Sequence, residues 1–157
     1  MMKTFFRITL LVLIALFIVV QFFQPERNNS ERGENHLFAG EEVPEQVQTL
    51  LTNACLDCHS NQTRYPWYNR VAPFSWMINQ HVTEGKENLN LSDWGTMDIF
   101  GRLGVLEEMV EEVEKGEMPL ESYVWLHPDA QMDEENTQLL KDWTEQLSLE
   151  LLNELEE

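Results

Sequence analysis

The chain opens with an apolar segment that differs from everything after it. Between Phe5 and Phe23 the only polar residues are Arg7, Thr9 and Gln21. A helix of this length is close to what a membrane crossing needs, since about 20 residues at about 1.5 Å each span a hydrocarbon core. The segment ends in Val-Val-Gln-Phe-Phe-Gln-Pro, without the small residues of a cleavage site, which favours an uncleaved signal anchor over a cleaved signal peptide. We therefore expect a transmembrane helix within residues 1–24.

A polar stretch follows and then a region of helical periodicity. Residues 25–42 are charged and lack apolar periodicity, which predicts a solvated linker, with His36 exposed in it. From Pro44 the apolar residues recur at helical spacing, so the sequence predicts a first helix that ends at the pair of cysteines. We assign residues 43–157 to one small domain.

Three more helices are expected in this domain, and no convincing strand. A short one covers about Ser75–Thr83. A second, capped by Ser92, runs to about Lys115 and is ended by Gly116. The last begins near Asp133, and its apolar side is formed by Leu139, Leu140, Trp143, Leu147 and Leu151. The pattern predicts an all-α fold.

The candidate chemistry lies in the sequence Cys55-Leu56-Asp57-Cys58-His59. Two thiols three positions apart with an adjoining histidine are the attachment signature of a c-type haem. Each cysteine can form a thioether with a haem vinyl group, and the imidazole of His59 then lies beneath the iron as proximal ligand. The sequence predicts one haem c, bound covalently through Cys55 and Cys58.

Two other uses of a Cys-x-x-Cys pair remain as alternatives. A zinc site needs further ligands, yet the chain has only 2 cysteines, and His36, His81 and His127 are scattered. A thioredoxin-like dithiol is typical of a βαβ context, which the sequence does not show. An export signal places the motif outside the cytoplasm, where c-type haem attachment takes place.

The stretch Asn61–Leu91 is rich in aromatic residues interrupted by prolines. These side chains are suited either to an ordinary core or to a wall packed on the porphyrin, with Tyr65 and Trp67 as the nearest candidates. Arg64 and Arg70 are candidates for the haem propionates, because a guanidinium pairs well with a carboxylate. Solvent exposure is an equal alternative for both arginines.

The sixth iron ligand decides the chemistry of such a site. Met118 is the first choice, since it is followed by a proline in an extended stretch after a helix, and thioether ligation would raise the reduction potential. His81 is the second choice and would lower the potential. His127, before a proline, is the third, and an iron without a strong sixth ligand is also open.

The charge of the chain limits its partners. A formal net charge of −18 excludes general nucleic-acid binding, which needs a basic surface. The acidic surface is most simply a means of solubility, and a docking partner would have to be basic.

The stretch Cys55–Tyr68 resembles the bacterial haem-binding domain family, found in membrane-anchored, cytochrome c-like proteins. Later motifs match as well, among them Val71–Trp76, Leu89–Trp94, Gly116–Pro119 and Leu126–Pro128. The resemblance covers about residues 43–145 and implies a helical, cytochrome c-like fold around one covalent haem. It also implies Met118 as distal ligand and Trp143 on a terminal helix that packs on the first helix. The aromatic insert before Met118 leaves open whether His81 replaces it.

We expect a membrane-anchored electron carrier rather than an enzyme. It would lie in the cytoplasmic membrane with its haem domain on the periplasmic side, and exchange electrons with redox partner proteins of the cell envelope. The first alternative is a haem sensor or small peroxidase with an open or weak sixth ligand. The second is a dithiol oxidoreductase without haem.

Overall fold

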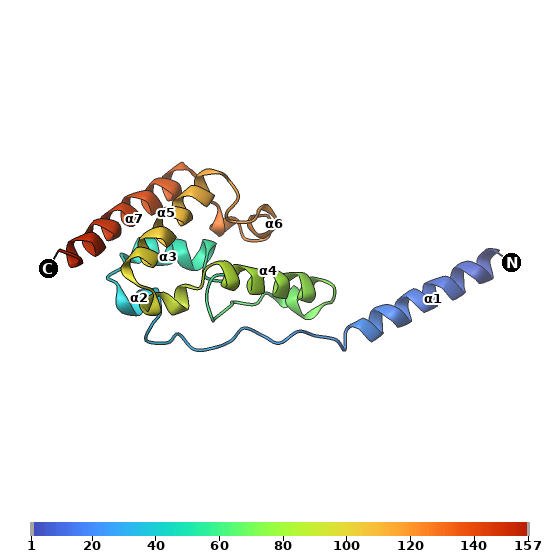
Figure 1. Ribbon diagram of the computed structural model, residues 1–157. Helices are drawn as coiled ribbons and strands as arrows, with labels where there is room; N and C mark the ends of the chain where they lie inside the picture. The colour runs from blue at the N-terminus through green and yellow to red at the C-terminus, as the bar shows by residue number, and fades with distance from the viewer. Residues whose placement is uncertain (1, 157) are drawn as a thin grey trace.

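The structure, a computed structural model, describes residues 2–156 and is helical, as predicted. A long helix α1 stands apart from a cluster of helices that forms the domain (Figure 1). The elements in order are α1 (Met2–Val20), α2 (Leu37–Gly40), α3 (Glu45–Ala54), η1 (Trp67–Arg70), α4 (Phe74–Asn88), η2 (Leu91–Thr96), α5 (Ile99–Glu114), α6 (Glu121–Val124), η3 (Pro128–Ala130) and α7 (Glu134–Glu154), where η denotes a 3₁₀ helix. Within the described residues the only β pairing is an isolated bridge between Asn29 and Gln62.

The core lies where α3, α5 and α7 meet. Both views show α5 lying along α7, and α3 also packs against α7. Trp143 on α7 is buried in the same cluster as Leu50 and Leu51 on α3. The expected packing of an aromatic terminal helix on the first helix is therefore confirmed. Asp133 caps α7 by accepting a hydrogen bond from the backbone of Asn136, also as predicted.

Helix α3 has the predicted position and buried side. Pro44 precedes the first helical residue, and Val47, Leu50 and Leu51 are buried. The helix ends at Ala54, so the chain enters Cys55 directly from its last turn.

The helix expected over Ser92–Lys115 is divided into two elements, so the predicted start at Ser92 is wrong. Residues Leu91–Thr96 form the 3₁₀ helix η2, and α5 begins only at Ile99, capped by Asp98. The hydroxyl of Ser92 accepts a hydrogen bond from the backbone of Asn61 (2.9 Å) instead of capping a helix. Gly116, with a φ of 74°, follows α5 in the left-handed conformation of a helix C-terminus.

Helix α4 is longer than the predicted Ser75–Thr83. It covers Phe74–Asn88 and ends at Leu89. The additional turns carry Gly85 and bring the end of the helix to the Cys55–His59 motif, as described below.

The polar segment before α3 is partly packed on the domain. The expectation that His36 is solvated is wrong, because only 1% of its surface is exposed. Its Nδ1 accepts a hydrogen bond from the backbone of Phe38 and so caps α2. Leu37 is fully buried, and α2 lies against η2. The sequence pattern missed this packing because the residues that bury it are distant along the chain.

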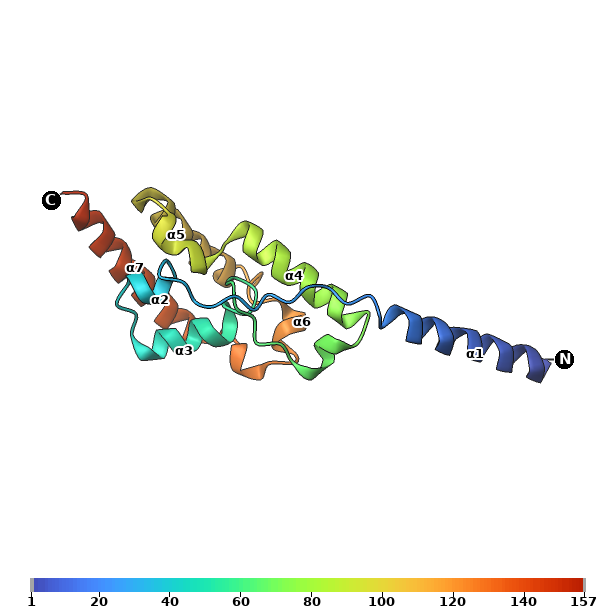
Figure 2. The same cartoon turned by 90° about the horizontal axis from the view of Figure 1, so that it is seen from below.

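Helix α1 is long and apolar enough to cross a membrane, with a mean hydropathy of 2.3 and none of its residues buried. Its end lies beside the start of α4 in both views (Figures 1 and 2).

Candidate haem site

The Cys55–His59 motif forms a tight turn at the end of α3. The backbone of Cys58 donates a hydrogen bond to the carbonyl of Cys55 (3.1 Å), and so does that of His59 (2.9 Å). These bonds hold the two cysteines and the histidine on a single turn. Both thiols are free and half-buried. The turn therefore presents two unbonded sulfurs next to an imidazole.

The imidazole of His59 is held by the chain that leaves α4. Its Nδ1 lies 3.1 Å from the carbonyl oxygen of Leu89, and the backbone of Leu91 donates to the carbonyl of His59 (2.9 Å). Since a carbonyl only accepts, Nδ1 carries the hydrogen and Nε2 keeps its lone pair. Burial lowers the pKa of His59 and favours the neutral ring. An oriented, neutral imidazole of this kind is suited to bind iron.

Gly85 lets α4 approach the motif closely. A Cβ atom on Gly85 would lie 2.9 Å from the carbonyl oxygen of Cys58 and 3.0 Å from its Cβ. Any side chain at this position would force the helix away from the cysteine. Because Gly85 has no side chain, α4 can pack directly against Cys58.

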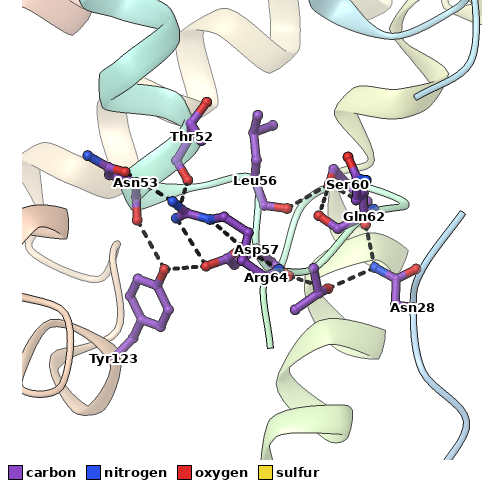
Figure 3. Close-up of polar contacts among 10 residues, drawn as sticks. Asn28, Thr52, Asn53, Leu56, Asp57, Ser60, Gln62, Arg64 and Tyr123 are labelled. Atoms are coloured by element: carbon purple, nitrogen blue, oxygen red, sulfur yellow. Dashed lines mark hydrogen bonds and ion pairs between the residues drawn. The ribbon is translucent and has the colours of Figure 1, made fainter. Parts of the chain in front are cut away.

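Asp57, the second of the two residues between the cysteines, is the centre of a polar network (Figure 3). It is buried, and its Oδ1 accepts from the backbone (2.9 Å) and from Nε (3.1 Å) of Arg64. Its Oδ2 accepts from Nη2 of Arg64 (3.2 Å) and from the hydroxyl of Tyr123 (2.7 Å). Burial raises the pKa of Tyr123, and the bond to Asp57 raises it further. The carboxylate thus ties both residues to the motif.

The guanidinium of Arg64, a candidate for a haem propionate, has partners within the protein. Besides Asp57 it donates to the carbonyl of Thr52 (2.6 Å) and to the side chain of Asn53 (3.2 Å). These contacts hold the chain after the motif against the last turn of α3. In this arrangement Arg64 stabilises the conformation of the motif.

Two side-chain hydroxyls from the residues just after the motif donate hydrogen bonds to carbonyls of the motif. The hydroxyl of Ser60 donates to the carbonyl of Leu56 (2.7 Å), and that of Thr63 donates to the carbonyl of Asp57 (2.7 Å). The side chain of Asn28 bonds both Ser60 and Thr63, so it connects the N-terminal segment to the site (Figure 3).

Met118, the first candidate for the distal ligand, lies on the segment between α5 and α6 and is half-buried. Its backbone donates to the carbonyl of Glu112, which completes the end of α5. Five residues later, Tyr123 bonds Asp57 and thereby fixes this segment to the motif. The structure therefore connects the chain around Met118 with the cysteines.

The two other candidate ligands have different surroundings. His81 is half-buried on α4, one helical turn before Gly85 and thus on the side of the helix that faces Cys58. His127 stacks on Tyr123, with ring centroids 4.1 Å apart, and its Nδ1 lies 3.0 Å from the carbonyl of Tyr123. His127 is thus held by the turn that follows α6.

Large aromatic side chains are exposed on η1, at the start of α4 and after α6. Trp67 on η1 is 80% exposed and Trp125, after α6, is 81% exposed, while half of Phe74 is exposed on α4. Tyr65, another candidate, is half-buried, and its hydroxyl accepts from the backbone of Asn28 (2.8 Å). Exposed aromatic side chains of this size are typical of surfaces that bind an apolar ligand or a partner.

The environment of the thiols does not favour the alternative uses of the motif. Burial raises the pKa of Cys55 to about 12 and that of Cys58 to about 11. A dithiol oxidoreductase needs the opposite, since the thiolate is the nucleophile. Among residues 2–156, no group of three His, Cys, Asp or Glu side chains could hold a metal ion, which leaves the zinc alternative without support.

Four contributors to the site were not assigned by sequence reasoning: Asp57, Gly85, the carbonyl of Leu89 and Tyr123. Asp57 and Leu89 lie in stretches that carry the family resemblance, but nothing in those stretches indicated a role for them. The contribution of Leu89 comes from its backbone, which leaves no trace in the amino-acid sequence.

The comparisons with known proteins agree with this site. No curated protein and no solved structure shows a significant match to the chain. The haem-binding domain family matches residues 15–146, which is most of the chain and contains the whole motif. The arrangement of two free thiols beside an oriented imidazole fits the ligand that gives this family its name. The chain belongs to the haem-binding domain family.

Proposed function

We propose that this protein is a membrane-anchored electron carrier with one covalent, c-type haem. The observation that carries the proposal is the turn after α3, where Cys55 and Cys58 are free and His59 is oriented by the carbonyl of Leu89. The iron of a bound haem would supply reversible one-electron chemistry.

Each residue of the turn has a separate task in this proposal. The thiols of Cys55 and Cys58 would hold the haem, each by adding across a vinyl double bond, with sulfur bonding one carbon and the thiol hydrogen moving to the other. This addition needs no oxidant. Nε2 of His59 would bind the iron, and the bond from Nδ1 to the carbonyl of Leu89 holds the ring in place. Asp57 stabilises the turn through its ion pair with Arg64 and its hydrogen bond from Tyr123.

Met118 is the proposed distal ligand. The distal ligand must approach from the side of the porphyrin opposite His59. Leu89, the C-cap of α4, bonds the ring of His59, and His81 is carried by that same helix, so α4 would lie with the proximal ligand of a bound haem. Met118 lies on a different segment, which Tyr123 holds beside the motif. This geometry supports Met118 over His81.

The remaining parts of the proposal concern location and partners. The length and hydropathy of α1 support a membrane anchor, and attachment of haem c requires the domain to lie on the extracytoplasmic side. Redox proteins of the cell envelope would be its partners, and those that dock on the acidic surface of this chain, with its net charge of −18, should be basic.

Optical spectroscopy of the full-length protein, expressed with haem-maturation machinery, tests this function. A low-spin spectrum that does not change with carbon monoxide supports a carrier whose iron has two strong ligands. Rapid carbon monoxide binding to the reduced protein would support a sensor or peroxidase instead. Absence of haem absorption would overturn both.

A further inference from the structure

A cavity of about 280 Å³ lies where the membrane helix meets the domain. On one side it is lined by residues 24–27, which begin four positions after the last residue of α1, Val20. On the other side it is lined by Tyr65, Asn69, Arg70 and Asn79, which come from η1, the chain before it and α4. Of these residues only Tyr65 and Arg70 were candidates for contact with haem, and none belongs to the Cys55–His59 motif.

Hydrogen bonds fix the end of the membrane helix to the domain at this place. The side chain of Gln21 donates to the carbonyl of Ala72 (3.2 Å) and accepts from its backbone nitrogen (2.9 Å). The indole of Trp76 donates to the carbonyl of Phe23 (2.6 Å). Figures 1 and 2 both place the end of α1 beside the start of α4. If α1 spans the hydrocarbon core, the cavity lies at the level of the lipid headgroups.

The cavity contains two arginines with no carboxylate partner. In residues 2–156, carboxylates pair with Arg64, Arg102, Lys115 and Lys141. Arg27 and Arg70 form no ion pair there, although the chain carries 28 acidic residues. The guanidinium of Arg27 lies over the ring of Tyr65, 5.4 Å from its centroid. Two guanidinium groups on one cavity are suited to bind a phosphate.

The cavity meets α4 on a different side from the cysteines. Gly85 marks that side through its close approach to Cys58. Asn79 precedes Gly85 by six positions on the same helix and therefore lies about 120° around its axis. Asn79 thus lines the cavity from a side of α4 other than the one that adjoins the cysteines.

We propose that this cavity binds the phosphodiester of a phospholipid headgroup from the membrane in which α1 is anchored. Arg27 and Arg70 hold the phosphate. Glu26 also lines the cavity, and its carboxylate opposes a second negative charge. The best fit is therefore a zwitterionic headgroup with an ammonium group near Glu26, such as ethanolamine. A bound lipid would hold the domain in one orientation on the membrane. The inference rests on the proposed membrane anchor.

Native mass spectrometry of the full-length holoprotein, released from detergent containing phosphatidylethanolamine, tests the proposal. We expect the wild-type protein to retain one lipid, and Arg70→Gln and Arg27→Gln each to retain about tenfold less, as expected for the loss of a charge-assisted hydrogen bond. Arg32→Gln is the matched control. It removes the same charge from an exposed residue that lies over Phe38, outside the cavity, and should retain lipid like the wild type.

Three results would overturn the inference, and they differ in what else they affect. Equal lipid retention by the wild type and both cavity variants would overturn the site alone. Displacement of the lipid by millimolar inorganic phosphate would show that the site takes a soluble phosphate rather than a headgroup. Release of the wild-type protein from membranes by alkaline carbonate would overturn the membrane anchor, and the headgroup site with it.

Discussion

The hydroxyl of Tyr123 donates a 2.7 Å hydrogen bond to Oδ2 of Asp57, although the two residues are 66 positions apart in the chain. Asp57 lies between the two cysteines, and Tyr123 lies on α6, just beyond Met118. This one contact therefore connects the turn that holds the proposed proximal ligand with the segment that carries the proposed distal ligand.

Replacing Tyr123 with Phe should destabilise the protein by about 1–3 kcal/mol, because a buried carboxylate oxygen loses a donor. Denaturant unfolding measures the change. Tyr68→Phe is the matched control, since within residues 2–156 the hydroxyl of Tyr68 has no hydrogen-bond partner, and its loss should cost much less. A similar stability for the two variants would contradict the role given to the Tyr123–Asp57 bond.

Replacing Gly85 with Ala should weaken the site, because the new methyl group would lie 2.9 Å from the carbonyl oxygen of Cys58. We expect a loss of about 1–3 kcal/mol in the free energy of unfolding, together with less haem attached per protein. Gly104→Ala on α5 is the control. No atom lies within 4 Å of its added methyl group, so a gain of about 0.5–1 kcal/mol is expected there. Equal yields of attached haem in both variants would argue against the close packing of α4 on the motif.

Replacing Met118 with Leu should abolish the sulfur-to-iron absorption at the red edge of the visible spectrum and let carbon monoxide bind to the reduced iron. Met132→Leu removes another half-buried thioether, next to the core cluster, and should leave the spectrum unchanged. If His81→Ala opens the iron and Met118→Leu does not, the order of the two ligands is wrong.

The stability of the protein should depend on the protonation of His36. Burial and, to a smaller extent, the charge of Arg32 lower the pKa of His36 in the folded state. Unfolding returns it to its ordinary pKa of 6.5, so the unfolded chain takes up the proton more readily. The stability from neutral His36 is complete above this pKa and is lost as the pH falls below it. Protonation also removes the acceptor that caps α2.

Denaturant unfolding at about pH 7.5 and about pH 5.5 checks this dependence. Between these values the wild-type protein should lose more stability than His36→Asn, whose side-chain oxygen can keep the cap without titrating. Identical losses in the two proteins would show that His36 does not contribute to the pH dependence.

The sequence correctly predicted the elements that are determined by neighbouring residues, such as an apolar run, helical spacing or a helix cap. The apolar run of α1, the spacing of Val47, Leu50 and Leu51 in α3, and the cap of α7 at Asp133 all appear in the structure. The Cys55–His59 motif and the family resemblance indicated haem, and the family match over residues 15–146 confirms haem binding.

Contacts between distant parts of the chain account for the errors. Ser92 is a residue type that often caps helices, but its hydroxyl accepts a hydrogen bond from the backbone of Asn61, and α5 starts at Ile99 with Asp98 as its cap. His36 lies in a polar stretch, yet its neighbour Leu37 is buried and α2 packs on η2. Neither partner could be identified from spacing alone, because each lies tens of residues away.

The mass of the mature full-length protein, measured under denaturing conditions after export and haem maturation, tests the central proposal most directly. The account predicts the mass of the polypeptide plus one haem, and a loss of this addition when Cys55 and Cys58 are both replaced by Ala. A mass equal to that of the amino acids alone would contradict covalent attachment of haem to this chain.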